Sequence, residues 1–215
     1  PGVGAEVIGV ASYDNTHVTQ ASFTVSPDAT AIGYSPASGA PAAPTSGDLV
    51  MSKSGTPTTT NDGCVALDAA AHVGKAVLIR RGTCSFFIKA SNAQAAGAAA
   101  VVLYNNVAGF LNPTVAGAPP ITIPVVAITA AGGALIDGRI AAGETTMTWT
   151  DEVASVPQAT GGLISGFSSF GMAADLTLKP DIGAPGGSIF STIPLDQGGY
   201  GTISGTSMSS PHVAG

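Results

Sequence analysis

Alternating strand-like and helix-like segments in the middle of the chain constrain its fold more than any other feature. Three short apolar runs have the length and composition of buried strands, namely 75–79, 99–104 and 123–128. Two segments have small and apolar residues at helical spacing, namely 86–96 and 130–142. The order is strand, helix, strand, loop, strand, helix. It predicts a small α/β unit with some parallel strand pairing.

Capping residues mark the ends of the first predicted helix. Ser85 precedes it and has a side chain suited to an N-cap, and Gly97 follows it as a C-terminal stop. The second predicted helix contains Gly132 and Gly133, which weaken it because glycine has a poor helix propensity.

The composition excludes several classes of partner. The chain has 215 residues, enough for one large domain or two small ones, and a net charge of −6 with 9% charged residues. Phosphate binding needs a basic face, so we expect no nucleic-acid partner. The longest apolar runs are too short to span a bilayer, so we expect no membrane partner. The lysine-poor, Ser/Thr/Gly-rich composition favours a secreted protein.

Cys64 and Cys84 lie on either side of the first apolar run. If bridged, they close a loop of about twenty residues worth roughly 3 kcal/mol and imply an oxidising compartment. The residues alone are equally compatible with two unrelated free thiols. The spacing is not that of a zinc site, and Asp68 and His72 are the only other candidate ligands nearby. We therefore expect no metal at the cysteines, identify no cofactor, leave structural calcium open, and expect His72 to face solvent.

The chain ends in GTSMSSPHVAG, residues 205–215, a small-residue turn that leads into a short helix. Such a turn exposes Ser207 at a helix N-terminus, where free backbone N–H groups and the helix dipole favour an anion. The Ser207 N–H is then placed to hold the oxygen of a tetrahedral intermediate, with Thr206 supporting the turn. The alternative is an ordinary helix capped by Thr206 or Ser207.

This ending resembles the nucleophile motif of the subtilisin-like serine proteases, the subtilases of peptidase family S8. Two upstream segments are similar to the same family, FSSFG at 167–171 and LKPDIGAPG at 178–186, and the strand-like segment 7–12 matches a family strand. The resemblance implies a parallel-sheet α/β fold and a secreted endopeptidase. It also implies protein or peptide substrates, hydrolysed by acyl-enzyme chemistry with Ser207 as the nucleophile.

A second resemblance covers the middle of the chain. The segments GKAVLIRRGTCSF at 74–86, NAQAAGA at 92–98 and IPVV at 123–126 resemble the protease-associated (PA) domain, a module inserted in some large subtilases. This resemblance implies a mixed β-sheet with helices, a Cys64–Cys84 disulfide, and a role in substrate access, protein contacts or dimerisation. We predict a first subtilase segment, an inserted PA domain and a nucleophile segment at 1–20, 21–154 and 155–215, respectively.

The catalytic partners of Ser207 are missing from the sequence. A serine needs a base and a group that orients the base, and in subtilases the aspartate and histidine precede the serine. Neither Asp-Ser/Thr-Gly nor His-Gly-Thr-His occurs, and the Ala-x-Gly-Asn context of the oxyanion asparagine is absent too. We expect His17 to be a loop residue and His212 to support the helix.

The chain is therefore predicted to be the C-terminal part of a catalytic region, inactive alone and completed by the missing Asp/His segment. The alternative is a pseudoprotease fragment or a non-catalytic PA module for protein interaction. Three further side chains have competing interpretations. Arg80 and Arg81 either bind an anion or form an Arg-Gly turn that closes a strand, and we expect the turn. Asp181 is expected to be a structural hydrogen-bonding carboxylate.

Overall fold

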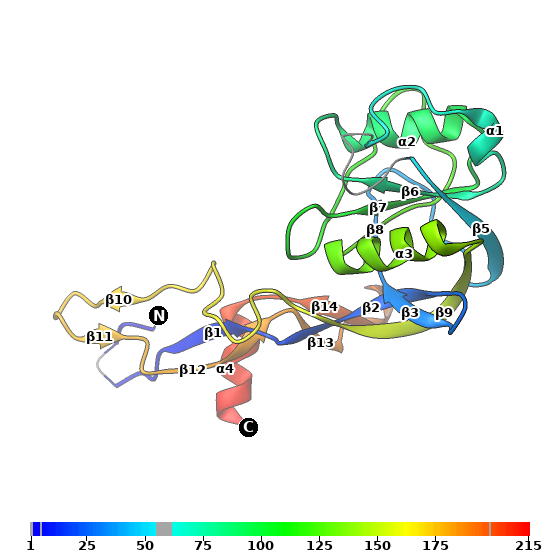
Figure 1. Cartoon of the computed structure of the whole chain (residues 1–215). Coiled ribbons are helices and arrows are strands. Elements are labelled where there is room, and N and C mark those ends of the chain that lie inside the picture. Colours follow the sequence, from blue (N-terminus) through cyan, green and yellow to red (C-terminus); the bar gives the residue numbers. More distant parts are fainter. Residues whose placement is uncertain (1, 5, 55–61, 198) are drawn as a thin grey trace. The chain divides into compact units, whose positions relative to one another are not determined.

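The computed structural model describes residues 2–4, 6–54, 62–197 and 199–215, and the chain divides into two compact units (Figure 1). Unit 1 consists of residues 1–19 and 155–215, and unit 2 of residues 20–154. The division falls within two long strands, β2 (His17–Val25) and β9 (Thr146–Pro157).

Unit 2 is built on a mixed eight-stranded sheet with the strand order β3-β2-β9-β5-β6-β7-β8-β4. Strands β5, β6, β7 and β8 run parallel to one another, while β2–β3, β5–β9 and β4–β8 are antiparallel pairs. The remaining bounds are β3 (Thr30–Gly33), β4 (Ser35–Pro36), β5 (Gly47–Lys53), β6 (Ala76–Arg80), β7 (Ala100–Tyr104) and β8 (Val125–Ile128).

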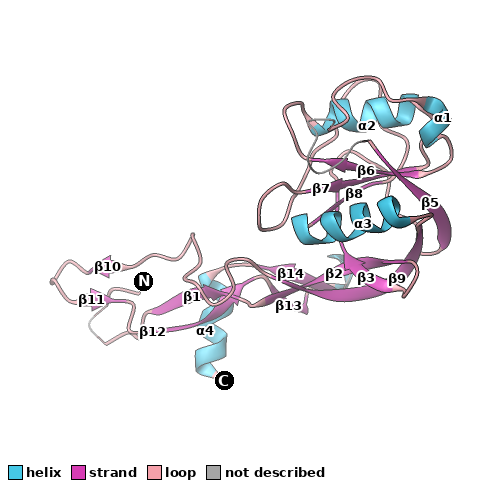
Figure 2. Cartoon of the chain, in the orientation of Figure 1, coloured by secondary structure: helices cyan, strands magenta, loops and turns pink. Residues whose placement is uncertain are grey.

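Helices α2 (Phe86–Ala95) and α3 (Ala130–Ala142) lie on opposite sides of the parallel strands (Figure 2). Successive residues of a strand point to opposite faces, so each parallel strand contributes to two cores. In β6, Leu78 packs in the core that contains Ile136 of α3, whereas Val77 and Ile79 pack in the core that contains Ala90 of α2. The predicted α/β fold with parallel pairing is confirmed.

The predicted ends of the first helix are also confirmed. The Ser85 side chain accepts a hydrogen bond from the Ile88 N–H at 3.3 Å, and Gly97 has a φ of 78° just beyond the helix. This left-handed conformation favours glycine and stops the helix.

The prediction that His72 faces solvent is wrong. His72 ends the short helix α1 (Ala69–His72), which begins after the N-cap Asp68, and its side chain is buried. Its Nδ1 lies 2.9 Å from the Ser52 Oγ of β5. Burial, together with the charge of Lys75, lowers the pKa of the imidazole. One turn of helix is enough to direct this side chain at the sheet, and a four-residue helix has no periodicity that sequence inspection detects.

Unit 1 contains three two-stranded pairings and one longer helix. Its strands are β1 (Val10–Asp14) parallel to β12 (Ile182–Gly187), and the antiparallel pairs β10 (Gly171–Met172) with β11 (Leu178–Lys179) and β13 (Ile189–Thr192) with β14 (Tyr200–Ile203). A short 3-10 turn, η1 (Leu195–Gln197), lies between β13 and β14, and α4 (Thr206–Ala214) packs against β1 and β12. No helix in the described part of the chain has the length and apolarity needed to cross a membrane.

Candidate active site

Ser207 is the second residue of α4 and is exposed. The N-cap of α4 is Gly205, which makes no side-chain capping bond, so the alternative in which Thr206 or Ser207 caps the helix is wrong. The first N–H groups of a helix have no intrahelical partner. The Ser207 N–H therefore belongs to the set of donors that can bind an anion at this end of α4.

The turn before Ser207 is held by the end of β12. The Gly205 N–H donates a hydrogen bond to the Gly186 carbonyl at 2.8 Å, and the Ser188 N–H donates to the Ser204 Oγ at 2.8 Å. Gly186 is also tightly enclosed. A Cβ at this position would lie 2.7 Å from the Gly205 carbonyl oxygen and 2.5 Å from the Ser12 Oγ, so no larger residue fits without a shift.

A buried network of hydroxyl groups lies beside the same strands. Ser12 of β1 is fully buried, its Oγ is 2.9 Å from the Ser165 Oγ, and its N–H donates to the Ser168 Oγ at 3.0 Å. The Ser165 hydroxyl donates to the Asp14 carboxylate at 2.6 Å, so it accepts the hydrogen bond from Ser12. The other carboxylate oxygen of Asp14 accepts from Thr160 at 2.5 Å. Asp14 is thus engaged in holding the loops around β1.

The remainder of α4 is shaped by three of its own side chains. The buried Ser209 hydroxyl donates to the Thr206 carbonyl at 2.9 Å. Pro211 lacks an N–H, so the Ser207 carbonyl four residues earlier does not receive the usual helical hydrogen bond from that position. The His212 Nδ1 donates to the Met208 carbonyl at 2.8 Å, as expected for a residue that supports the helix.

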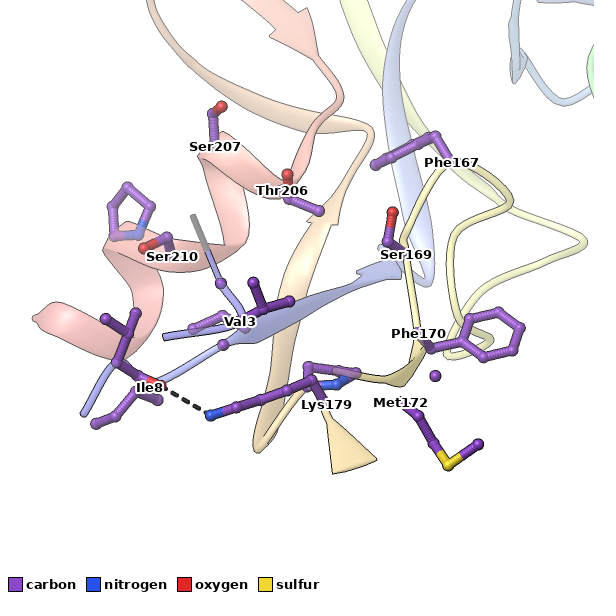
Figure 3. A pocket seen from close by; sticks show the side chains of 17 residues that line it. Val3, Ile8, Phe167, Ser169, Phe170, Met172, Lys179, Thr206, Ser207 and Ser210 are labelled. Carbon is purple, nitrogen blue, oxygen red and sulfur yellow. Dashed lines mark hydrogen bonds between the residues drawn. The ribbon is translucent and has the colours of Figure 1, made fainter. Parts of the chain in front are cut away.

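Two hollows meet at Ser207. The larger has a volume of about 860 Å³ and is lined by the N-terminal segment, residues 167–172 and α4. Figure 3 shows Thr206 and Ser207 on the first turn of α4, with Phe167, Ser169 and Phe170 on the facing segment. The smaller hollow, about 420 Å³, is lined by β13, β14 and α4. Ser207 lines both hollows.

No general base accompanies Ser207 in the part of the chain that the structure describes. The His17 Nδ1 is 3.2 Å from the Thr16 Oγ1, and His72 and His212 bond to Ser52 and Met208. No hydrogen bond joins a histidine or carboxylate to Ser207 among these residues.

Asp181 has the structural role predicted for it. Its Oδ2 accepts hydrogen bonds from the Lys179 ammonium at 2.8 Å and from the Gly9 N–H at 2.7 Å. The Lys179 hydrogen bond, followed by that of the Gly9 N–H, lowers the pKa of the Asp181 carboxyl. Lys179 also donates to the Val7 carbonyl at 2.9 Å (Figure 3), so the two residues tie the segment before β1 to the segment before β12.

In unit 2, Cys64 and Cys84 form a disulfide. Lys89 of α2 is fully buried against this bridge. Its ammonium forms an ion pair with the Asp62 carboxylate at 3.3 Å and lies 3.5 Å from the Cys64 sulfur. The bridged sulfurs and Asp62 lie close together, but a disulfide sulfur is not a thiolate ligand, so this group does not form a metal site.

Comparison with known proteins shows what the central part of the chain resembles. Residues 45–136 match the family described as the PA domain. The chain is thus similar to the PA domain over this segment. It is 40% identical over 147 residues to the minor extracellular protease Vpr of Bacillus subtilis (strain 168), an alignment that covers 66% of this chain and 18% of Vpr. It is likewise 40% identical over 146 residues to a C5a peptidase of Streptococcus pyogenes, covering 66% of this chain and 12% of that protein.

The chain thus spans less than a fifth of the length of these proteases. A solved zinc aminopeptidase of Bacillus subtilis is 25% identical, with a TM-score of 0.45 over 67% of this chain and 34% of the aminopeptidase.

Proposed function

We propose that this chain is part of an extracellular subtilisin-like serine endopeptidase and that Ser207 is its nucleophile. The observation that carries the proposal is the position of Ser207, exposed on the first turn of α4 where two hollows meet. The subtilase-like segments at 167–171, 178–186 and 205–215 and the two protease relatives support it. In this proposal residues 1–20 and 155–215 belong to the catalytic domain.

In the proposed reaction the Ser207 Oγ attacks the carbonyl carbon of the scissile peptide bond. A base takes the hydroxyl proton and later delivers it to the leaving amine, and the Ser207 N–H donates a hydrogen bond to the oxyanion. The acyl-enzyme ester is then hydrolysed by water. The base, its aspartate partner and the second oxyanion donor come from the Asp/His segment of the longer protein, outside this sequence.

Exposed apolar side chains support the proposal that unit 1 is completed by such a segment. Phe170, Leu178 and Leu195 expose 75%, 76% and 91% of their surfaces, respectively. Burial of each would contribute about 1.5–3 kcal/mol, so a covering partner is strongly favoured. The PA domain is then proposed to regulate access of large substrates to the site.

A fluorophosphonate probe tests the assignment of Ser207. In the longer protein the probe should label Ser207, and Ser207→Ala should abolish labelling, because the probe needs an activated serine. Thr202→Ala, which removes an exposed hydroxyl of β14 outside both hollows, is the matched control and should label normally. The 215-residue chain alone should stay unlabelled.

Labelling that persists in Ser207→Ala would place the nucleophile elsewhere. A folded longer protein that is never labelled would favour the non-catalytic PA module or pseudoprotease. In the active protein, removal of residues 21–154 should change cleavage of a folded protein more than cleavage of a short peptide. Equal changes would exclude a role in substrate access.

A further inference from the structure

Two consecutive arginines stand at the carboxyl ends of the parallel strands of unit 2. Arg80 is the last residue of β6, and the Arg81 N–H continues the pairing with β7 by donating to the Tyr104 carbonyl at 2.8 Å. The Arg81 Nη1 donates to the Asn105 Oδ1 at 3.2 Å. Asn105 is buried, and its amide donates to the Gly109 carbonyl at 3.1 Å. A buried and anchored amide therefore holds the exposed guanidinium group of Arg81 at the strand ends.

These arginines have no carboxylate partner among the described residues. The ion pairs there engage Lys53, Lys89, Arg139 and Lys179. The positions that the structure leaves undescribed, residues 1, 5, 55–61 and 198, include no aspartate or glutamate. The chain has 13 acidic and 7 basic residues, so its carboxylates outnumber its cations. Composition therefore does not explain why these two arginines lack a carboxylate partner.

Arg81 is held by a neutral amide, which leaves most of its N–H groups and its full charge available. A guanidinium presents five donors in a planar fork that matches a carboxylate. Arg80 is half-buried and pairs in register with Tyr104 of β7. Burial and the charge of Asp137 raise the pKa of the Tyr104 phenol, and the charge of Arg80 acts against them. Arg80 and Arg81 are consecutive residues at one strand end, so their side chains leave opposite faces of the sheet, and neither forms an ion pair in the described part of the chain.

The position of the pair in the fold is one where parallel sheets bind ligands. Helix α2 follows β6 on one side of the sheet and α3 follows β8 on the other (Figure 2). In open α/β sheets, ligands bind outside the carboxyl ends of the strands, which is the edge where Arg80 and Arg81 stand. The N-termini of α2 and α3 adjoin the same sheet edge and add positive potential to it.

We propose that the carboxyl edge of β6 and β7 is a binding site for acidic peptide segments, with Arg80 and Arg81 as the residues that recognise carboxylates. A nucleic acid is not the expected occupant because the chain carries a net charge of −6 and has few other basic groups. The site would give the PA domain a preference for proteins with exposed acidic stretches. Binding is a property of this chain alone, so its test is independent of the proposed catalysis.

Fluorescence anisotropy with a labelled Glu-rich heptapeptide tests the site on the 215-residue chain at low ionic strength. The same peptide with Gln in place of Glu is the ligand control. Arg80→Gln with Arg81→Gln should raise the Kd for the Glu peptide by at least about tenfold, a loss of about 1.4 kcal/mol. The single variant Arg81→Lys keeps the charge but lacks the planar fork of arginine. It should bind the Glu peptide more weakly than the unchanged chain and more tightly than the double variant.

Lys75→Gln is the matched protein control. Lys75 directly precedes β6 at its other end and has no ion pair in the described part of the chain, so its removal lowers the net charge by one, half the change in the double arginine variant. It should change the Kd less than about twofold, in line with a weak long-range charge effect.

An equal loss in Lys75→Gln and the double arginine variant, with unchanged thermal unfolding, would overturn the proposal in favour of non-specific charge. Equal affinity for the Glu and Gln peptides would also overturn it. Complete displacement of the peptide by inorganic phosphate at equimolar concentration would also contradict the proposal. It would show that this edge binds anions in general and does not recognise a peptide.

Discussion

At the scale of single residues, the turn that carries Ser207 is limited by the space around Gly186. The Cβ of a larger residue at Gly186 would collide with the buried Ser12 hydroxyl and with the Gly205 carbonyl oxygen. The Gly205 N–H bonds to the Gly186 carbonyl, so any shift at Gly186 is transmitted directly to the residues before Ser207. A close approach of two backbone segments thus fixes the position of the serine.

Gly186→Ala should therefore displace the turn. We expect a loss of about 1–3 kcal/mol in unfolding free energy from overpacking. In the longer protein, fluorophosphonate labelling of Ser207 should slow by about 10- to 100-fold, because small misplacements of a reacting group are costly. Gly166→Ala is the control, since a Cβ there would meet open space. Normal labelling of Gly186→Ala would show that the turn does not depend on this contact.

At the scale of elements, segment 62–64 is attached to α2 by the disulfide and by Lys89. Burial lowers the pKa of the Lys89 ammonium, against the attraction of Asp62. Burial also raises the pKa of Asp62, but the Thr83 N–H and Lys89 outweigh it and hold the pKa below its ordinary value. Because the folded-state pKa of Asp62 is depressed, its stabilising effect is present at neutral pH and is lost as the pH falls through that depressed value.

Lys89→Met should destabilise unit 2 strongly at pH 7, by about 3–5 kcal/mol, because it leaves a buried carboxylate without its cation. Adding Asp62→Asn should restore a large part of the loss by removing the unpaired charge. Lys75→Met, at a lysine without an ion pair among the described residues, should have little effect. Denaturant unfolding of the unchanged chain and of the four variants, which include Asp62→Asn alone, measures this. Additive losses in the double variant would show that the two residues act independently.

The elements predicted from the sequence are those with strong local signals. Strands β6, β7 and β8 are continuous buried runs, and α2 has a serine cap and a glycine stop, so their types and approximate positions follow from short windows. The predicted strands do not include β2, β3 and β9, which residues 17–33 and 146–157 contribute to the sheet. In β9 the buried Met147 and Trp149 alternate with half-buried threonines, which is the period-two signal of a strand with one buried face.

Long-range contacts could not be predicted. Trp149 packs edge-on against Phe23 and Tyr34, with ring centroids 5.8 Å apart in both pairs. These residues are more than a hundred positions apart, and nothing local in the sequence pairs them. The same holds for the hydroxyl network of the site. The motif at 205–215 marks Ser207, but Ser12 and Ser165 carry no signal of their own until β1 and the 165–168 turn come together.

At the scale of the whole molecule, apolar burial is distributed unequally between the two units. Both hydrophobic core clusters lie within residues 20–154. Most of the large exposed apolar side chains belong to unit 1 instead, including Ile8, Phe170 and Leu178. Because apolar burial is the main favourable contribution to folding, unit 2 has a source of stability of its own that unit 1 lacks.

We therefore expect unit 2 to fold alone and unit 1 to depend on additional chain. A fragment of residues 17–157, which keeps β2 and β9 intact, should unfold cooperatively with the same midpoint as the 215-residue chain. In hydrogen exchange of the 215-residue chain, amides of β6 and β7 should be protected while those of β1 and β12 exchange rapidly, since local stability follows apolar burial. In the longer protein, β1 and β12 should become protected too. Strong protection of β1 and β12 in the short chain would show that unit 1 is stable without the proposed partner segment.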